Sequence, residues 1–200
     1  DLWQWICGIP TSVYSNCICG AYRDKERVNV ENDVTVITEY ANGATGSFIT
    51  CTHDAVGTDR FEIDLDKGKI VVEDSKKATV YKFNKSEAEM NATMSMMDVA
   101  RLTSGNSAGG DGLYTTEEFE NVDGWGYQHT TVMENFALHI LTGSPLLAPG
   151  SDGINGVNLA NAIQLSSWLG KKVENPVDEN EYLAELNKKI EEEGQFPTRS

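Results

Sequence analysis

Residues 33–51 read DVTVITEYANGATGSFITC and decide the fold, because two strand-like stretches flank a strong turn signal. Asp33 to Tyr40 and Thr45 to His53 are both rich in β-branched and aromatic residues, which favour strands. Ala41-Asn42-Gly43 joins them, and Asn-Gly favours a tight hairpin since both residues tolerate a positive φ. The stretch therefore predicts an antiparallel pair of strands.

Further strand-like stretches lie on both sides of this hairpin. One of them alternates apolar with acidic residues and reaches a second turn at Asp66-Lys67-Gly68, which predicts another hairpin. A sheet built this way has two faces, and the helices that follow can cover only one of them. We therefore predict an α+β fold with an open, predominantly antiparallel sheet of about six or more strands and helices on one face. The further strand candidates are Thr11 to Tyr22, Arg60 to Leu65, Lys69 to Glu73, Ala78 to Asn84 and Thr115 to Val122.

Helical patterns occupy the start and the last third of the chain. Thr130 to Leu141 repeats pairs of apolar residues every four positions, which predicts a broad stripe that is buried. Ser151-Asp152-Gly153 offers an N-cap for a helix to Leu169 that ends at Gly170, and Asp178 is an N-cap candidate for a charged helix to about Glu193. The buried face of the Asp152 helix is predicted to carry Leu159, Ala162, Ile163 and Ser166.

The region between Lys85 and Gly126 gives weaker signals. Its methionines indicate a helix, and filling gaps in a core is a commoner use of Met than forming an adaptable binding surface. Ser104 to Gly112 is rich in Gly, Ser and Asn and is expected to be a mobile loop. The methionines in question are Met90, Met94, Met96 and Met97.

Composition excludes several functions. The chain has 31 acidic and 16 basic residues, a net charge of −15, which argues against nucleic acid or anionic membranes as partners. No stretch approaches the roughly 20 apolar residues of a membrane span, so a soluble, cytoplasmic protein is expected. The cysteines lack CxxC spacing and the histidines lack metal-ligand spacing, so we predict buried thiols and no metal site. These residues are Cys7, Cys17, Cys19 and Cys51, with His53, His129 and His139.

Several motifs, in order and spacing, resemble the C-terminal domain of the Gfo/Idh/MocA oxidoreductases, the family of glucose-fructose oxidoreductase and inositol dehydrogenase. The first is the opening Asp-Leu-x-x-Trp-x-x-Gly-x-Pro of residues 1–10, and the second is the Tyr-Ala-Asn-Gly-Ala-x-Gly turn of residues 40–46. The others are Glu-Asn-Phe at residues 134–136 with a Gly-x-Pro at 143–145, and Asp152-Gly153 leading into a helix with Ser166 and Gly170.

The resemblance implies a fold like the C-terminal domain of glyceraldehyde-3-phosphate dehydrogenase. It also implies that an N-terminal Rossmann domain binds NAD or NADP, and that residues 1–200 form a single C-terminal domain without it. Because no Met precedes Asp1, we expect the chain to be a fragment. Residues 105–110 carry glycines but follow no strand, so no residue here is predicted to bind the cofactor.

The family's catalytic lysine and histidine are both expected upstream, so no catalytic residue is predicted in this chain. The family places that histidine three residues before an aspartate, which Asp1 matches. The resemblance implies that a His/Lys pair takes a proton from a sugar hydroxyl while hydride leaves the same carbon, and that Asp1 holds an adjacent hydroxyl. The alternative is that Asp1 only stabilises the helix dipole.

Trp125, Gln128 and His129 are the other candidate substrate-binding residues. A helix start preceded by Gly-Trp-Gly offers unpaired N–H groups, Trp125 can stack on a sugar ring, and His129 can hydrogen-bond its hydroxyls. Alternatively His129 is only a helix cap. For His53 and His139 we expect structural roles.

The leading hypothesis is a substrate-binding and oligomerisation domain of an NAD(P)-dependent dehydrogenase acting on a sugar, inositol or related polyol. As an isolated fragment it is expected to be inactive, because hydride transfer needs the dinucleotide. Its partners would be the missing Rossmann domain and a second copy docked through the open sheet face. The alternative is a non-catalytic dimerisation or carbohydrate-binding module.

Overall fold

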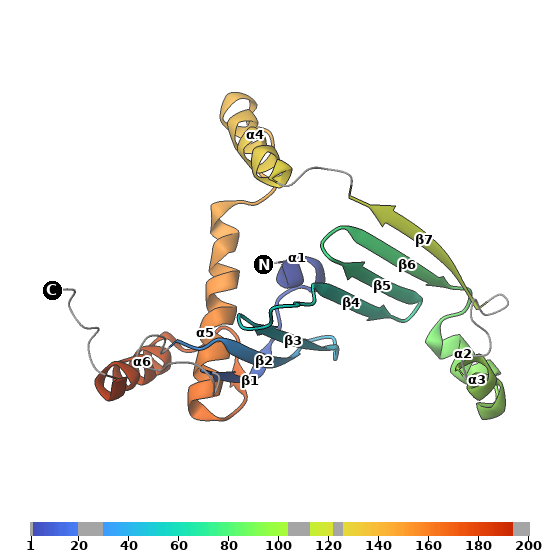
Figure 1. Ribbon diagram of the computed structural model, residues 1–200, viewed down its shortest axis with the longest axis horizontal. Helices are drawn as coiled ribbons and strands as arrows, with labels where there is room; N and C mark the ends of the chain where they lie inside the picture. Colours follow the sequence, from blue (N-terminus) through green and yellow to red (C-terminus); the bar gives the residue numbers. More distant parts are fainter. Residues whose placement is uncertain (1, 20–29, 104–112, 122–125, 194–200) are drawn as a thin grey trace. The chain divides into compact units, whose positions relative to one another are not determined.

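The computed structural model in Figure 1 describes residues 2–19, 30–103, 113–121 and 126–193. Within these residues the α+β, antiparallel fold is confirmed, with the strands divided between two sheets of four. The first sheet has the order β3-β2-β1-β8 and the second the order β4-β5-β6-β7. The chain forms two compact units, residues 1–55 with 132–200, and residues 56–131. Each sheet belongs to one unit.

The hairpin predicted in residues 33–51 is present in the first sheet. β2 (Asp33–Glu39) and β3 (Thr45–Cys51) pair antiparallel, and Gly43 takes a φ of 85° in the turn. The Asn42 side chain accepts a hydrogen bond from the N–H of Ala44 at 3.0 Å. β1 (Ser12–Ile18) pairs with β2, and β8 (Val173–Glu174) pairs with the start of β1.

One face of the first sheet is covered by α5 (Gly153–Leu169). Period-two alternation along β1 places Val13 against the helix and Tyr14 on the other face, so Val13 is fully buried while Tyr14 is 47% exposed. Gly170 ends α5 in the left-handed conformation that only glycine adopts easily. The core between the helix and the sheet consists of Val13, Val36, Leu159, Ala162, Leu165 and Val173.

Two serines of α5 complete the hydrogen bonding of β1 beyond the short strand β8. The buried hydroxyl of Ser166 accepts from the N–H of Ser15 at 3.0 Å and donates to the carbonyl of Lys171 at 2.7 Å. The hydroxyl of Ser167 accepts from the N–H of Cys17 at 2.9 Å. Since backbone N–H groups left unpaired in a protein interior are costly, these serines anchor the helix to the strand.

The opening helix α1 (Leu2–Cys7) ends before Gly8, which takes a φ of 83°. Its Trp3 ring lies 6.0 Å from the Phe48 ring of β3. A Cβ at Gly46 would lie only 2.3 Å from the Trp3 ring. This contact explains a glycine inside β3, where glycine is otherwise unfavourable.

The second sheet contains the hairpin predicted at Asp66-Lys67-Gly68 and two further strands. β4 (Arg60–Leu65) and β5 (Gly68–Glu73) are joined by a two-residue turn, and β6 (Lys77–Phe83) pairs with β5. β7 (Tyr114–Glu120) pairs with β6 although some thirty residues separate the two strands. The registers divide the side chains into two faces. One carries Phe61, Ile63, Ile70, Val72, Ala78, Val80 and Phe119, and the other carries Arg60, Glu62, Asp64, Lys69, Glu73, Lys77, Tyr81, Phe83, Tyr114 and Glu118.

The Met-rich stretch forms two short helices between β6 and β7. α2 (Glu87–Thr93) begins with a capping box in which Ser86 and Glu89 bond reciprocally, and α3 (Met96–Thr103) follows. Met96 is 88% exposed and Met97 is 67% exposed, so the prediction that these methionines fill a core is wrong for this pair.

The helix predicted at Thr130 to Leu141 is present as α4 (Tyr127–Thr142), but its apolar stripe is not buried. Met133 is 72% exposed and Ile140 is 67% exposed. The prediction that this stripe is buried is therefore wrong within the described residues, because the core there is built by α5 instead.

α6 (Glu179–Glu193) closes the described chain, and Asp178 caps it by accepting from two backbone N–H groups, as predicted. Trp168 of α5 stacks on Tyr182 of α6 with their ring centroids 5.6 Å apart. A short 3-10 turn, η1 (Gly150–Asp152), precedes α5. None of the described helices is long and apolar enough to cross a membrane.

All four cysteines are thiols, but the prediction that they are buried is wrong, because Cys51 is exposed at the end of β3 and none of the four is fully buried. The other three are half-buried. Burial raises the pKa of the Cys17 thiol above its ordinary value, so this thiol stays protonated at neutral pH. The predicted mobile loop at Ser104 to Gly112, including the glycines of residues 105–110, lies outside the described residues.

Candidate functional site

Two of the four predicted substrate-binding residues, Asp1 and Trp125, lie outside the described residues. The other two, Gln128 and His129, lie in the first turn of α4. Gly126 precedes this helix with a φ of 92°, and its carbonyl accepts the backbone N–H of His129 at 3.1 Å. The N–H of His129 is therefore already used within the helix start rather than left for a ligand.

The side chains of Gln128 and His129 are exposed and, within the described part of the chain, have no hydrogen-bond partner. They are consecutive on a helix and so point in different directions, about 100° apart around its axis. Gln128 and His129 are therefore near each other because they are adjacent in sequence, and the fold does not turn their side chains toward one another. Both side chains nevertheless keep their full hydrogen-bonding capacity toward a ligand, which leaves the predicted role open to test.

A loop clamp lies at the other end of α4. Asn135 donates from Nδ2 to the carbonyl of Pro145 at 3.1 Å and accepts at Oδ1 from the N–H of Leu147 at 2.8 Å. One turn further along the helix, Nδ1 of His139 donates to the carbonyl of Ser144 at 2.6 Å. Because these side chains hold three backbone groups, the Glu-Asn-Phe and Gly-x-Pro motifs of residues 134–136 and 143–145 act together to fix the loop after the helix.

His53 has a structural setting at the end of the first sheet. Its Nδ1 lies 3.1 Å from Nδ2 of Asn32, and its Nε2 lies 3.9 Å from Oδ2 of Asp33. Since the Asn32 amide nitrogen is a donor, the imidazole accepts at Nδ1, and its Nε2 faces the Asp33 carboxylate. This matches the structural role expected for His53.

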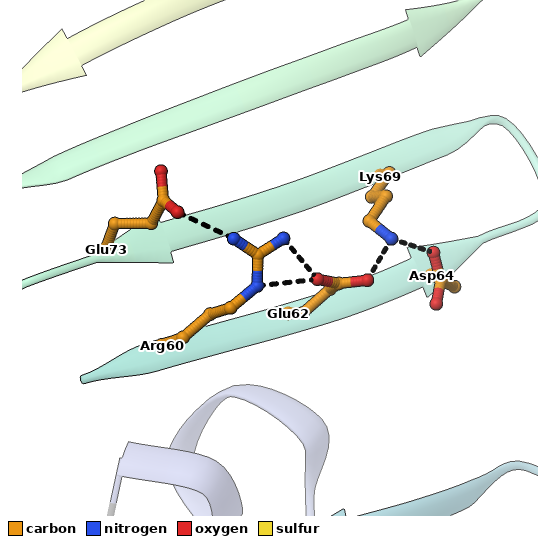
Figure 2. A network of polar contacts seen from close by, with 5 residues as sticks. All are labelled: Arg60, Glu62, Asp64, Lys69 and Glu73. Atoms are coloured by element: carbon orange, nitrogen blue, oxygen red, sulfur yellow. Dashed lines mark hydrogen bonds and ion pairs between the residues drawn. The ribbon is translucent and has the colours of Figure 1, made fainter. Parts of the chain in front are cut away.

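A network of charged side chains, not predicted as a site, lies on the polar face of the second sheet (Figure 2). Glu62 lies at its centre: Oε2 accepts from Arg60 Nε at 3.0 Å and from Arg60 Nη2 at 2.7 Å, and Oε1 accepts from Lys69 Nζ. Arg60 also donates to Glu73 at 2.6 Å, and Lys69 lies 3.3 Å from Asp64. Five side chains from β4 and β5 therefore hold one another in fixed positions.

The hydrogen bonds of the network favour the charged forms of Glu62, Lys69 and Arg60. Hydrogen bonds from Lys69 and then from Arg60 lower the pKa of Glu62 below its ordinary value. Hydrogen bonding to Glu62 raises the pKa of both Lys69 and Arg60. These groups therefore do not exchange protons near neutral pH, and the network can orient or hydrogen-bond a ligand but cannot serve as a general acid or base.

The alternation Arg60-x-Glu62-x-Asp64 is visible in the sequence. The tight turn that follows it is the signal that could have revealed the network. A two-residue turn pairs Leu65 with Gly68, which places Asp64 opposite Lys69 and Glu62 within diagonal reach of that lysine. The register of this hairpin thus brings most of the network's side chains together.

Comparison with known proteins gives a match over most of the chain. A family profile described as "Oxidoreductase family, C-terminal alpha/beta domain", that of the Gfo/Idh/MocA proteins, matches residues 1–174. The chain belongs to the Gfo/Idh/MocA oxidoreductase family. A search of curated proteins found no match.

Solved structures of several oxidoreductases share this fold at low sequence identity. Levoglucosan dehydrogenase in complex with NADH and levoglucosan is 18% identical, with a TM-score of 0.61, over 89% of this chain and 48% of that chain. An aldose-aldose oxidoreductase from Caulobacter crescentus, complexed with glycerol, is 15% identical with a TM-score of 0.58, over 86% and 43%. A putative myo-inositol dehydrogenase from Sinorhizobium meliloti 1021 is 17% identical with a TM-score of 0.57, over 87% and 46%. The Gfo/Idh/MocA chain described here thus spans less than half the length of these structures.

Proposed function

We propose that this chain is the substrate-binding and oligomerisation domain of an NAD(P)-dependent oxidoreductase that acts on a sugar, inositol or a related polyol. The observation that carries the proposal is the family match over residues 1–174. Similar structures that hold NADH together with levoglucosan support the substrate and cofactor classes. A second domain N-terminal to this one, of the Rossmann type, would hold the dinucleotide, in line with the partial length of the match.

In this proposal the two domains divide the chemistry. When bound by the N-terminal part, a nicotinamide would supply the hydride acceptor, and a Lys/His pair of that part would take the hydroxyl proton. Residues of this chain hold the substrate: Asp1 at an adjacent hydroxyl, Trp125 against a ring face, and Gln128 and His129 at further hydroxyls. The exposed side chains of Gln128 and His129, without partners in the described residues, support such a role. Without its partner domain the 200-residue chain would be inactive.

The open face of the first sheet is the proposed oligomer contact. α5 covers one face, whereas Ile37 is 51% exposed and Ile49 is 73% exposed on the other. Uncovered apolar sheet faces commonly mark association surfaces, and a two-fold axis would place two identical faces together. A cytoplasmic location is consistent with the four thiols.

The oligomer contact can be tested with the double variant Ile37→Glu, Ile49→Glu. Each glutamate replaces apolar burial with an unpaired charge, at about 2 kcal/mol or more per site, and the two-fold axis doubles the effect. Sedimentation should therefore show an association at least a thousandfold weaker. Ile190→Glu on α6, at a position 51% exposed, is the matched control and should leave association unchanged. Equal association of all three proteins would reject this contact.

The substrate role can be tested in the intact gene product by hydride transfer from polyols to NAD+ and NADP+. His129→Ala should raise KM about two- to tenfold with a smaller change in kcat, because one substrate hydrogen bond contributes about 0.5–1.5 kcal/mol. His53→Ala removes an imidazole from the end of the first sheet and is the matched control. A KM for His129→Ala equal to that of His53→Ala would remove His129 from the site.

A further inference from the structure

A shallow hollow of about 300 Å³ lies on the polar face of the second sheet. Its floor is Val71, which is 5% exposed, and the long side chains of all four strands form its walls. The lining residues are Arg60, Lys69, Val71, Tyr81, Phe83 and Tyr114. The hollow thus combines an apolar floor, an aromatic wall and a charged wall within a single sheet.

The aromatic wall is held in place by its own ring contacts. Tyr81 and Tyr114 meet edge to face, with ring centroids 5.5 Å apart and an interplanar angle of 78°. Phe83 lies 6.4 Å from Tyr114 at 53°. Edge-to-face geometry leaves ring faces available, and the three rings are each half-buried. A flat, weakly polar ligand can stack here with little loss of side-chain freedom.

The basic side chains of the charged wall are outnumbered by their acidic neighbours. Arg60 and Lys69 share Glu62, and each has a second carboxylate within reach, Glu73 and Asp64 respectively (Figure 2). Two positive charges thus meet three negative ones, so the local charge is −1. An anionic ligand such as a phosphate or a sugar acid would be repelled. Fixed ammonium, guanidinium and carboxylate groups still offer both donors and acceptors, which suits neutral hydroxyl groups.

We propose that this hollow binds a neutral polyhydroxylated ring, a hexopyranose or a cyclitol, with one C–H face against Tyr114 or Tyr81 and its hydroxyls toward the Arg60–Glu62–Lys69 network. The proposal rests on the proposed function for its ligand class. It assigns that class to a hollow whose lining residues are not among the substrate-binding residues predicted from the sequence. Aromatic stacking and the net negative charge together select a neutral ring over an anionic one.

Binding can be measured on the intact gene product without nucleotide, with 13C-labelled tyrosine rings and methyl glucoside, myo-inositol and glucuronate as probes. At least one neutral ring should shift the Tyr81 and Tyr114 ring signals, and glucuronate at the same concentration should leave them in place. Tyr114→Ala should weaken binding of that probe about tenfold, since stacking contributes on that scale. Phe119→Ala removes a ring from the opposite face of the same strand and should not change it.

A second variant separates ligand selection from folding. Glu62→Gln removes the central carboxylate, so glucuronate should then shift the same tyrosine signals and bind at least tenfold more tightly than to the unmodified protein. The proposal is overturned if neither neutral ring shifts these signals, if Phe119→Ala weakens binding as much as Tyr114→Ala, or if glucuronate binds better than the neutral rings before the substitution. Hydride transfer with unaltered tyrosine signals overturns this proposal alone, whereas tyrosine shifts without hydride transfer overturn only the proposed oxidoreductase function.

Discussion

Replacement of Ser166 by alanine should destabilise the first unit strongly. The Ser166 hydroxyl is fully buried, accepts from the N–H of Ser15 at 3.0 Å and donates to the carbonyl of Lys171 at 2.7 Å. The substitution leaves the buried N–H of Ser15 and the carbonyl of Lys171 without this partner. Losing the bond costs about 1–3 kcal/mol for the N–H and less for the carbonyl. We therefore expect the free energy of unfolding to fall by about 2–4 kcal/mol, a large share of a typical total of about 5–15 kcal/mol.

Urea unfolding followed by circular dichroism measures this change. Ser167→Ala should cost only about 1 kcal/mol, because the bond from the N–H of Cys17 to its hydroxyl, 2.9 Å long, is half-exposed. Ser47→Ala, at an exposed position on β3, is the matched control and should shift the midpoint little. A Ser166→Ala protein with the same unfolding midpoint as Ser47→Ala would refute the anchoring of α5 to β1 by these serines.

Three further predictions concern other contacts. Gly46→Ala should lower stability by about 1–3 kcal/mol in the same urea assay, because the new Cβ would lie 2.3 Å from the Trp3 ring, and an unchanged midpoint would contradict that packing. Asn135→Ala should speed amide hydrogen exchange in the loop after α4, where it removes two hydrogen bonds to the backbone, and equal exchange rates would show that the clamp is unimportant. Hydrogen bonds from Lys69 and Arg60 lower the pKa of Glu62 in the folded protein. The ionised Glu62 therefore stabilises the fold at pH values above the ordinary glutamate pKa of about 4.3, and this stabilisation is lost as the pH falls through the lower pKa of the folded state. Carboxyl NMR should find the pKa of Glu62 below the ordinary glutamate value, and an ordinary value would rule out the network in solution.

Local signals in the sequence were sufficient for most individual elements. Asn42-Gly43 predicted its hairpin because the turn needs a positive φ, and the tight turn at Asp66-Lys67-Gly68 predicted the second hairpin. The capping role of Asp178 also followed from its position before a helical stretch. These features depend on neighbours within a few residues.

Features that depend on distant contacts were not predictable in the same way. The division of the strands into two sheets depends on pairings such as β1 with β8, which lie some 150 residues apart. The stripe on α4 shows that the helix needs a partner surface but not which surface supplies it. The exposure of Met96 and Met97 was equally unpredictable from local sequence, since Met occurs both in cores and at contact surfaces.

The charged network and the aromatic wall differ in how far the sequence could reveal them. The network follows from one hairpin, whose two-residue turn fixes Glu62 near Lys69. The aromatic wall needs the pairing of Phe83 with Tyr114 across the Met-rich segment between β6 and β7, which no local pattern specifies. Of the residues predicted from the motifs, Gln128 and His129 lie together at the start of α4 and await a functional test.

Hydride transfer measured side by side for the intact gene product and for the 200-residue chain tests the central claim most directly. The intact protein should reduce NAD+ or NADP+ with a sugar, inositol or related polyol, and the 200-residue chain should neither reduce nor bind the nucleotide. An intact protein that binds neither nucleotide, or a 200-residue chain that transfers hydride alone, would contradict this claim.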